Sequence, residues 1–266
     1  MRFERVMLDD EGAYIDAYIA DPTPKFTRKA ILVIPGGGYG KVCSDREGEP
    51  IAHAFIPYGY NAFVLNYYVD KQKPFPIQLI QATKAIKYIK DNAEALGIDP
   101  EELYVVGFSA GGHLAACTGI LWKIPELYEA SDMPYGYCKP KGIMLIYPVV
   151  NDHAGSFRKL LCAEEPTEEM LEKVFVDRHV DADSAPAFIM HTSNDEIVDV
   201  RNSLTLAVAY KAAGLQFEMH IYPDAPHGGA LGNKITSNGR AKHENPSIAE
   251  WVRLAAVWAE NLPENE

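Results

Sequence analysis

Short apolar runs alternate with amphipathic segments along most of the chain. Apolar residues in the segment 77–96 recur with the 3.6-residue period of a helix, and Gly97 stands where a helix C-terminus is usually closed. The apolar runs have the length and β-branched content of buried strands. Strands are expected at 30–34, 61–67, 103–106, 142–150, 187–192 and 217–222, and further helices at 49–58, from 114 onward, at 200–213 and at 247–261.

This alternation predicts an α/β fold. Strands that each lead into a helix favour a doubly wound, mostly parallel sheet, here as a single domain over residues 1–266. The alternating patterns at 2–8 and 14–20 differ, because they flank the turn-forming residues 9–12 and so predict a hairpin.

Residues 151–185 do not follow this alternation of strands and helices. This stretch is rich in charge and is expected to form one or two short helices. Two interpretations are equally open: a lid-like excursion over the sheet, or an ordinary solvated connection, since charge runs usually mark surface.

Composition and charge narrow the function. The chain has 266 residues, 47% of them hydrophobic and 23% charged, as in ordinary globular proteins. Its formal net charge is −12 and it has no basic cluster, which argues against nucleic acid and anionic membrane as partners. The same charge favours a small neutral substrate. Oligomeric state, a homo-oligomer included, is left open.

Cysteine usage and the N-terminal segment predict a cytoplasmic location. The cysteines are scattered without a C-x-x-C pair, so reduced thiols are expected at Cys43, Cys117, Cys138 and Cys162. The first six residues lack the apolar stretch of a signal peptide, and no segment approaches the roughly 18 apolar residues that span a bilayer.

The segment Gly107-Phe108-Ser109-Ala110-Gly111 lies between an expected strand and an expected helix. This is the Gly-x-Ser-x-Gly nucleophile elbow in its required context. The tight turn forces the serine into a strained backbone conformation, and the flanking positions must lack side-chain bulk. The alternative is that Ser109 only caps the helix.

Asp195 and His227 complete a candidate catalytic triad with Ser109. Both follow Ser109 in the chain order acid, then histidine, that α/β hydrolases use, and each directly follows an expected strand. Ligands gather at the carboxyl ends of strands in open α/β sheets, so the three should share one rim. His227 would act as the base and Asp195 would orient it.

Other residues compete for these roles. His113 lies one turn after Ser109 but inside the expected helix, where a structural role is favoured. Glu196 and Asp199 neighbour Asp195, and Asp199 is expected to cap the next helix. Asp152 follows the preceding strand, and Asp224 lies very near His227 in sequence but stays open as the acid.

Consecutive glycines, Gly36-Gly37-Gly38, follow the strand at 30–34. Backbone N–H groups of Gly37 and Gly38, with that of Ala110, are candidates for an oxyanion hole, because glycine lets an oxygen approach closely. Taken alone, the glycines are also compatible with a flexible turn. No zinc-ligand spacing, G-x-G-x-x-G or P-loop motif is present, so neither a metal nor another cofactor is expected.

Several motifs together resemble the α/β-hydrolase esterases. They are Gly-Gly-Gly-Tyr after a strand, Gly-Phe-Ser-Ala-Gly-Gly-His-Leu-Ala, Ser-Ala-Pro-Ala-Phe-Ile-Met-His-Thr-Ser-Asn-Asp, and Ala-Pro-His-Gly. They are most similar to the branch of acetyl esterases and acetylxylan-esterase-like enzymes, which is related to the hormone-sensitive-lipase group. The chain departs from the lipases in having Pro35 where they have histidine, and Asp199 after Val198 where proline is common.

The resemblance implies hydrolysis of short-chain carboxylic esters, often acetyl groups on sugars, through an acyl-enzyme on Ser109. Candidate pocket residues are Tyr39, Phe75, Phe108 and Trp122, although aromatic residues at such places are as often core. Alternatives on the same fold are a peptidase or thioesterase, or a binding module without catalysis.

Overall fold

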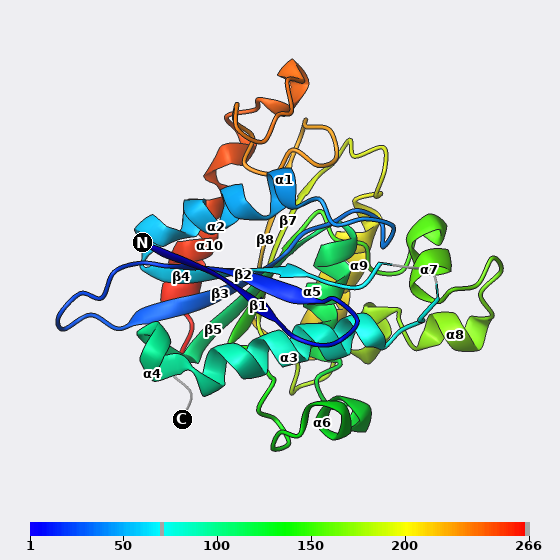
Figure 1. Ribbon diagram of the computed structural model, residues 1–266. Coiled ribbons are helices and arrows are strands. Elements are labelled where there is room, and N and C mark those ends of the chain that lie inside the picture. Colours follow the sequence, from blue (N-terminus) through cyan, green and yellow to red (C-terminus); the bar gives the residue numbers. More distant parts are fainter. Residues whose placement is uncertain (70–71, 264–266) are drawn as a thin grey trace.

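The computed structural model describes residues 1–69 and 72–263. Within these residues the strands form one eight-stranded sheet in the order β1-β2-β4-β3-β5-β6-β7-β8 (Figure 1). Strands β1 and β2 form the expected hairpin and pair antiparallel, β2 pairs antiparallel with β4, and the remaining pairs are parallel. The strand bounds are β1 Arg2–Met7, β2 Tyr14–Ile19, β3 Arg28–Ile34, β4 Tyr60–Asn66, β5 Ile98–Phe108, β6 Gly142–Ile146, β7 Ala187–Thr192 and β8 Phe217–Tyr222.

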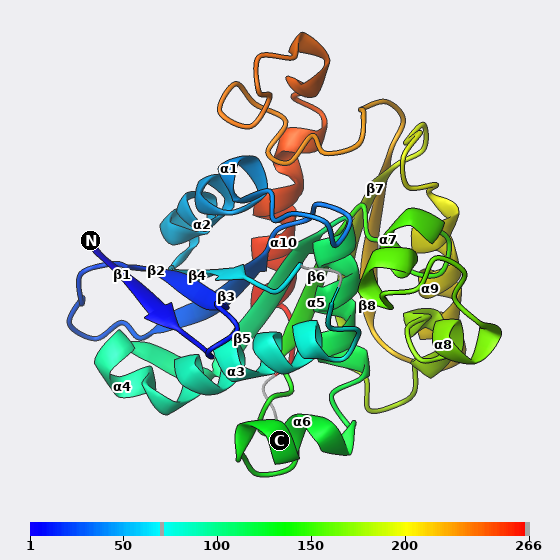
Figure 2. The same cartoon turned by 45° about the vertical axis from the view of Figure 1, so that its right-hand side comes forward.

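Helices cover both faces of this sheet (Figure 2). The α-helices are α1 Ser44–Glu47, α2 Glu49–Phe55, α3 Ile77–Asp91, α4 Ala93–Leu96, α5 Ala110–Ile120, α6 Pro125–Ser131, α7 Ala154–Leu160, α8 Glu168–Glu172, α9 Arg201–Ala212 and α10 Trp251–Glu260. Leu32 of β3 packs into the core shared with α3, α5 and α9, whereas its neighbours Ile31 and Val33 pack into the core shared with α2 and α10. This alternation confirms the predicted doubly wound, mostly parallel α/β architecture.

Some predicted boundaries were wrong for local reasons. The helix predicted at 77–96 breaks at Asn92, whose side-chain amide donates to the Tyr88 carbonyl and ends α3 before α4 begins. Gly97 closes α4 with a left-handed φ of 64°, as predicted. The strand predicted at 142–150 ends at Ile146, because Tyr147 turns the chain at a φ of 40°.

The segment 151–185 contains α7, α8 and a 3₁₀-helix at Val176–His179. Its apolar side chains are part of the core, with Phe157, Leu160 and Val174 buried beside α5. The segment is therefore packed against the sheet-covering layer along part of its length, and its motion as a lid stays a prediction. All four cysteines are free thiols. No helix within the described residues is long and apolar enough to cross a membrane.

Candidate active site

Ser109 occupies the sharp turn between β5 and α5, with φ 54° and ψ −119°. The flanking glycines make the turn sterically feasible. A Cβ added to Gly107 would lie 2.1 Å from the Gly111 carbonyl oxygen, and one added to Gly111 would lie 2.2 Å from that of Ile34. The predicted strained serine and its requirement for bulk-free neighbours are therefore present.

A chain of hydrogen bonds joins Ser109, His227 and Asp195. The Nε2 atom of His227 lies 2.8 Å from Ser109 Oγ, and its Nδ1 atom lies 2.6 Å from Asp195 Oδ2. Because a carboxylate only accepts, Nδ1 carries the proton and Nε2 is left to accept from the serine hydroxyl. The residues follow β5, β8 and β7, so the shared carboxyl edge of the sheet brings them together as predicted. This geometry can activate a serine hydroxyl.

Asp195 is held by several donors besides His227. Its side chain is fully buried, and Oδ1 accepts from the backbone N–H groups of Ile197 at 2.9 Å and Val198 at 3.0 Å. His191 Nε2 lies 3.4 Å from Oδ2. Burial by itself would raise the pKa of Asp195, but the hydrogen bonds from His191, His227 and the backbone outweigh it and hold the pKa well below its usual range. The carboxylate is thus ionised whenever the protein is folded near neutral pH.

The competing histidine has a structural environment. His113 is fully buried, its Nε2 donates to the Val174 carbonyl at 2.7 Å, and its Nδ1 accepts from the Tyr39 hydroxyl at 2.7 Å. Burial lowers the pKa of His113 to about 4, against a weaker opposing effect of the Val174 bond. It is therefore a neutral residue whose hydrogen bonds connect α5 to two loops.

The acids that compete with Asp195 for the role of orienting His227 have other interaction partners. Asp199 was predicted to cap α9, but the N-cap position is Val200, and Asp199 Oδ1 instead accepts from the N–H of Arg201, the first residue of the helix. Asp224 accepts from the Asn194 amide. Asp152 is mostly exposed and lies 4.0 Å from Arg201. The structure thus places Asp195, among these acids, on the imidazole of His227.

The glycine loop lies against the elbow. A Cβ on Gly36 would come within 2.6 Å of the Phe108 carbonyl oxygen and 3.0 Å of Ser109 Cβ. Gly37 and Gly38 have positive φ values of 132° and 61°. Within the described part of the chain, no hydrogen bond uses the N–H groups of Gly37, Gly38 or Ala110. All three are thus free to donate to an oxyanion near Ser109, beside the positive end of α5.

Glu47 is a site residue that the sequence did not reveal. It ends α1 and is 2% exposed, with Oε2 accepting from the Gly36 N–H at 2.9 Å and Oε1 from the Tyr147 hydroxyl at 3.0 Å. The Tyr147 oxygen in turn accepts from Ala230 N–H at 3.1 Å, and its ring lies 4.9 Å from that of His227. Burial raises the pKa of Glu47, against opposing effects of His227 and Arg46. In sequence, only its nearness to the glycine loop distinguishes this glutamate from a surface charge.

The aromatic residues proposed as pocket-lining lie elsewhere, which corrects that prediction. Tyr39 and Phe108 are buried, the first on His113 and the second against Trp251 and Tyr147. Trp122 donates to the Asp183 carbonyl, and Phe75 packs against the core. None of the four lines the cleft that contains Ser109. Their apolar character is explained by the core.

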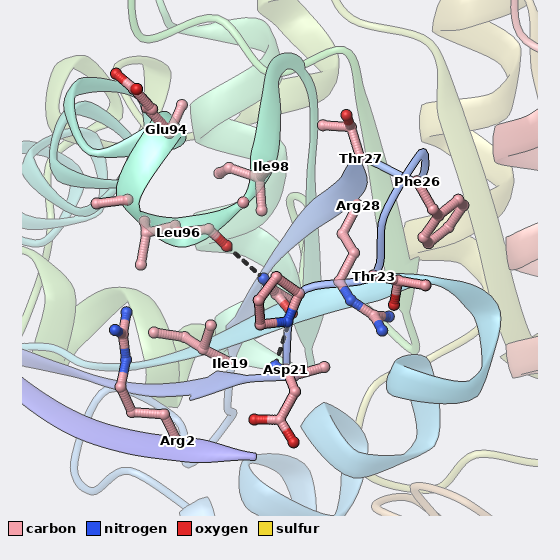
Figure 3. Close-up of a pocket in the computed structure, with 16 residues that line it drawn as sticks. Arg2, Ile19, Asp21, Thr23, Phe26, Thr27, Arg28, Glu94, Leu96 and Ile98 are labelled. Atoms are coloured by element: carbon pink, nitrogen blue, oxygen red, sulfur yellow. Dashed lines mark hydrogen bonds between the residues drawn. The ribbon is translucent and has the colours of Figure 1, made fainter.

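The Ser109 cleft is small, and one of the larger cavities of the described structure lies at the opposite edge of the sheet from it. The cleft has a volume of about 220 Å³ and is lined partly by Gly37, Gly38 and His227. Figure 3 shows a cavity of about 520 Å³ whose lining includes Arg28 and Ile98, where β3 and β5 begin. Parallel strands place their beginnings opposite their ends, so this cavity lies away from Ser109. No cluster of three or more His, Cys, Asp or Glu able to hold a metal ion occurs in the described ranges.

An α/β sheet with Ser109 at its elbow and His227 and Asp195 on the same rim is the arrangement of the α/β hydrolases. The chain belongs to the BD-FAE family, whose model matches residues 15–210. This agrees with the predicted resemblance to acetyl esterases of that fold.

Similar proteins are esterases and xylan-degrading enzymes. The chain is 35% identical to endo-1,4-beta-xylanase B of Butyrivibrio fibrisolvens over 77% of its length and 33% of that protein. It is 25% identical to an acetylxylan esterase of Xylanibacter ruminicola, over 77% of this chain and 42% of the other. The chain spans between 33% and 58% of the curated relatives it matches.

Solved structures match nearly the whole chain. The acetyl ester-xyloside bifunctional hydrolase of Caldicellulosiruptor lactoaceticus aligns with a TM-score of 0.82 and 31% identity, covering 97% of this chain and 96% of the other. The carboxylesterase Cest-2923 of Lactobacillus plantarum aligns with a TM-score of 0.85 and 28% identity over 100% of both chains. The fold is therefore that of carboxylesterases and acetyl ester hydrolases.

Proposed function

We propose that the protein is a serine carboxylesterase that hydrolyses short-chain, preferentially acetyl, esters through an acyl-enzyme on Ser109. The observation that carries the proposal is the continuous hydrogen-bonded chain from Ser109 Oγ through His227 to the buried Asp195. The similarity to esterases over nearly the full chain supports the same reaction class.

In the proposed reaction, each of the described groups has a separate role. His227 Nε2 takes the hydroxyl proton of Ser109 as Oγ attacks the ester carbonyl carbon, and the carbonyl oxygen becomes an oxyanion that accepts from the N–H groups of Gly37, Gly38 and Ala110. As the C–O bond breaks, His227 gives the proton to the leaving alcohol. Water then attacks the acyl carbon while His227 Nε2 takes its proton, the bond between that carbon and Ser109 Oγ breaks, and His227 returns the proton to Oγ as the carboxylic acid leaves. Asp195 holds the imidazole in the required tautomer and stabilises its charged form.

The proposed substrate is an acetylated sugar or xylo-oligosaccharide. The small cleft of about 220 Å³ favours a short acyl group. The relatives named acetylxylan esterase and endo-1,4-beta-xylanase B support a carbohydrate as the alcohol half.

The test is a chain-length series of p-nitrophenyl esters beside acetylated xylo-oligosaccharides. We expect fast acetyl release from both, a steep decline by butyrate, and loss of turnover in Ser109→Ala with unchanged circular dichroism. A panel of thioesters and prolyl amides is measured in parallel. Preference for amides or thioesters, or wild-type-like turnover by Ser109→Ala, would overturn the proposal.

A further inference from the structure

The Ser109 cleft is lined by permanent cations despite the acidic character of the whole chain. Lys41 follows the glycine loop, Arg46 lies in α1, and Arg240 lies in the segment after β8; all three line the cleft. Figures 1 and 2 show α1 and the segment after β8 at the same end of the molecule. A fourth cation, Lys159 of α7, has its Nζ atom 2.9 Å from the position of a Cβ on Gly40 and 3.8 Å from that on Gly38.

Of these cations, Arg46 forms an ion pair with a carboxylate and the other three do not. Among the described residues, Lys41, Lys159 and Arg240 have no carboxylate oxygen within 4.0 Å. The same is true of some cations away from the cleft, such as Lys84 and Lys211, whereas Lys29, Lys123 and Lys141 are paired. Arg46 lies 3.4 Å from Asp45, which is largely exposed, and its other nitrogen lies 3.2 Å from Cys43 Sγ.

The carboxylate that lines the cleft, that of Glu47, already accepts hydrogen bonds from the protein. Glu47 is buried, and each of its oxygens accepts from a donor of the protein, Gly36 and Tyr147 respectively. The remaining titratable groups on the cleft are Cys43, His153, His227 and His243. They add no negative charge near neutral pH, since burial raises the pKa of the Cys43 thiol. The cleft therefore combines several cations with one occupied carboxylate, and a cleft lined by one sign of charge concentrates ligands of the opposite sign.

The leaving alcohol lies on the side of His227, since His227 donates its proton to that group. On this side the cleft adjoins a hollow of about 580 Å³, and Arg240 lines both. The hollow is lined by acids as well as by the cations Arg240 and Lys242: Asp224 accepts from the Asn194 amide, Glu244 accepts from the Ser237 hydroxyl at 3.3 Å, and Glu196 is exposed to solvent. Arg240 has no carboxylate oxygen within 4.0 Å in the described part of the chain, and it is the cation that lines both the cleft and the hollow.

We propose that the natural ester carries a carboxylate on its alcohol half, as in an acylated uronic acid or another acylated hydroxy acid, and that Arg240, supported by Lys41 and Arg46, recognises it. The inference rests on the proposed serine esterase activity. It differs from the neutral substrate that the net charge favours, which stays a prediction until the two are compared.

The test uses two acetyl esters that differ in charge alone: p-acetoxyphenylacetate and p-acetoxyphenylacetamide. The methylene group insulates the phenol from the substituent, so the two leaving groups are chemically matched. We expect kcat/KM for the anionic ester to exceed that for the amide by about tenfold at low salt. The ratio should approach one in 1 M NaCl, where the Debye length is only about 3 Å.

Substitutions of single cations test which side chains recognise the carboxylate of the substrate. Arg240→Gln, and separately Lys41→Gln, should lower the anionic-to-neutral ratio several-fold, and because both side chains are exposed the fold is retained. Arg253→Gln on α10 removes the same charge outside the cleft and should leave the ratio unchanged. A ratio near one in the wild-type protein, or a ratio that Arg253→Gln lowers as much as Arg240→Gln, overturns the proposal.

A second pair separates the two halves of the ester. Preference for p-nitrophenyl hemisuccinate over p-nitrophenyl butyrate, without preference in the first pair, would place the carboxylate on the acyl half and overturn the assignment to the alcohol. Failure to hydrolyse any ester, p-nitrophenyl acetate included, would contradict the proposed function itself. The two failures are thus distinguishable.

Discussion

Glu47 shows how one buried side chain can join two parts of a site. Its carboxylate accepts from the glycine loop at Gly36 and from Tyr147, which itself accepts from Ala230 in the loop that carries His227. Any glutamine rotamer at this position presents an NH₂ group to one of two donors. A buried donor left without an acceptor costs roughly 1–3 kcal/mol.

We therefore predict that Glu47→Gln lowers kcat on p-nitrophenyl acetate by about ten- to a hundredfold, with a smaller change in KM. The loss falls on kcat because the residue positions the groups that act in the transition state. Steady-state kinetics measures the split. Glu49→Gln is the matched control, since Glu49 is exposed on the neighbouring helix α2. An unchanged kcat in Glu47→Gln would show that the link has no catalytic consequence.

At this scale the sequence predicted which three residues share one hydrogen-bonded chain, and it missed the residues that support them. Ser109, Asp195 and His227 were recognisable because chain order and strand-end position are encoded locally. Glu47 was not, since its role depends on contact with Tyr147, which is distant in the chain. His191 lies only four residues from Asp195, but it stands inside an expected strand, where a histidine gives no local sign of a role in the site. The aromatic pocket residues were misassigned for a related reason, because an apolar side chain gives no local sign of which cavity it faces.

At the scale of elements, the β5–α5 elbow depends on glycine through close packing. Gly111 has no room for a side chain, because a Cβ would lie 2.2 Å and 2.4 Å from the carbonyl oxygens of Ile34 and Pro35. Gly97 has a positive φ of 64° but open space around it. Glycine is thus required at Gly111 because a side chain would clash, and it is favoured at Gly97 because of the left-handed backbone conformation.

We predict that Gly111→Ala destabilises the protein by at least about 3 kcal/mol or prevents soluble expression, since backbone on both sides must move. Gly97→Ala should cost only about 1–2 kcal/mol, the penalty of an L residue in the left-handed region. Urea denaturation of both variants provides the comparison. Equal destabilisation by the two substitutions would contradict the steric account of the elbow.

His113 connects three elements: α5, the glycine loop through Tyr39, and the 151–185 segment through Val174. Its folded-state pKa is about 4, against 6.5 for an ordinary histidine. Between these values the unfolded chain binds a proton that the folded chain does not. The free energy of unfolding therefore falls as the pH is lowered through this window.

Between pH 7.5 and 5, this residue alone should reduce the free energy of unfolding by about 2 kcal/mol. We predict that His113→Gln, which has no ionisable side chain, shows a pH dependence smaller by about that amount. Urea unfolding of both proteins at the two pH values measures it. If the variant and the wild type lose stability equally on acidification, His113 is not the residue responsible.

Across elements, the sequence pattern predicted the strands of the sheet and the longer helices, but it missed the short helices α1 and α6 and did not predict where each element ended. The break at Asn92 depends on a side-chain hydrogen bond to Tyr88, and the end of β6 depends on the strained turn at Tyr147. Both are set by specific contacts, to which a hydrophobic pattern is insensitive.

For the whole molecule, net charge and local charge point in different directions. The sum of −12 favours a neutral ligand, while the Ser109 cleft gathers Lys41, Arg46 and Arg240 from segments far apart in sequence. A total taken over the chain contains no information about where its cations gather. Fold class, by contrast, was predictable because it follows from the order of elements, which the sequence displays directly.

The central claim is that Ser109 is the nucleophile, and labelling with a fluorophosphonate tests it most directly. We predict that the wild-type protein gains the mass of one phosphonyl group, that peptide mapping places it on Ser109, and that esterase activity is lost in step with labelling. Ser109→Ala should remain unlabelled, and His227→Ala should label far more slowly because the serine then lacks its base. Esterase activity that survives complete labelling of Ser109, or a label that forms on another residue as activity disappears, would contradict the account.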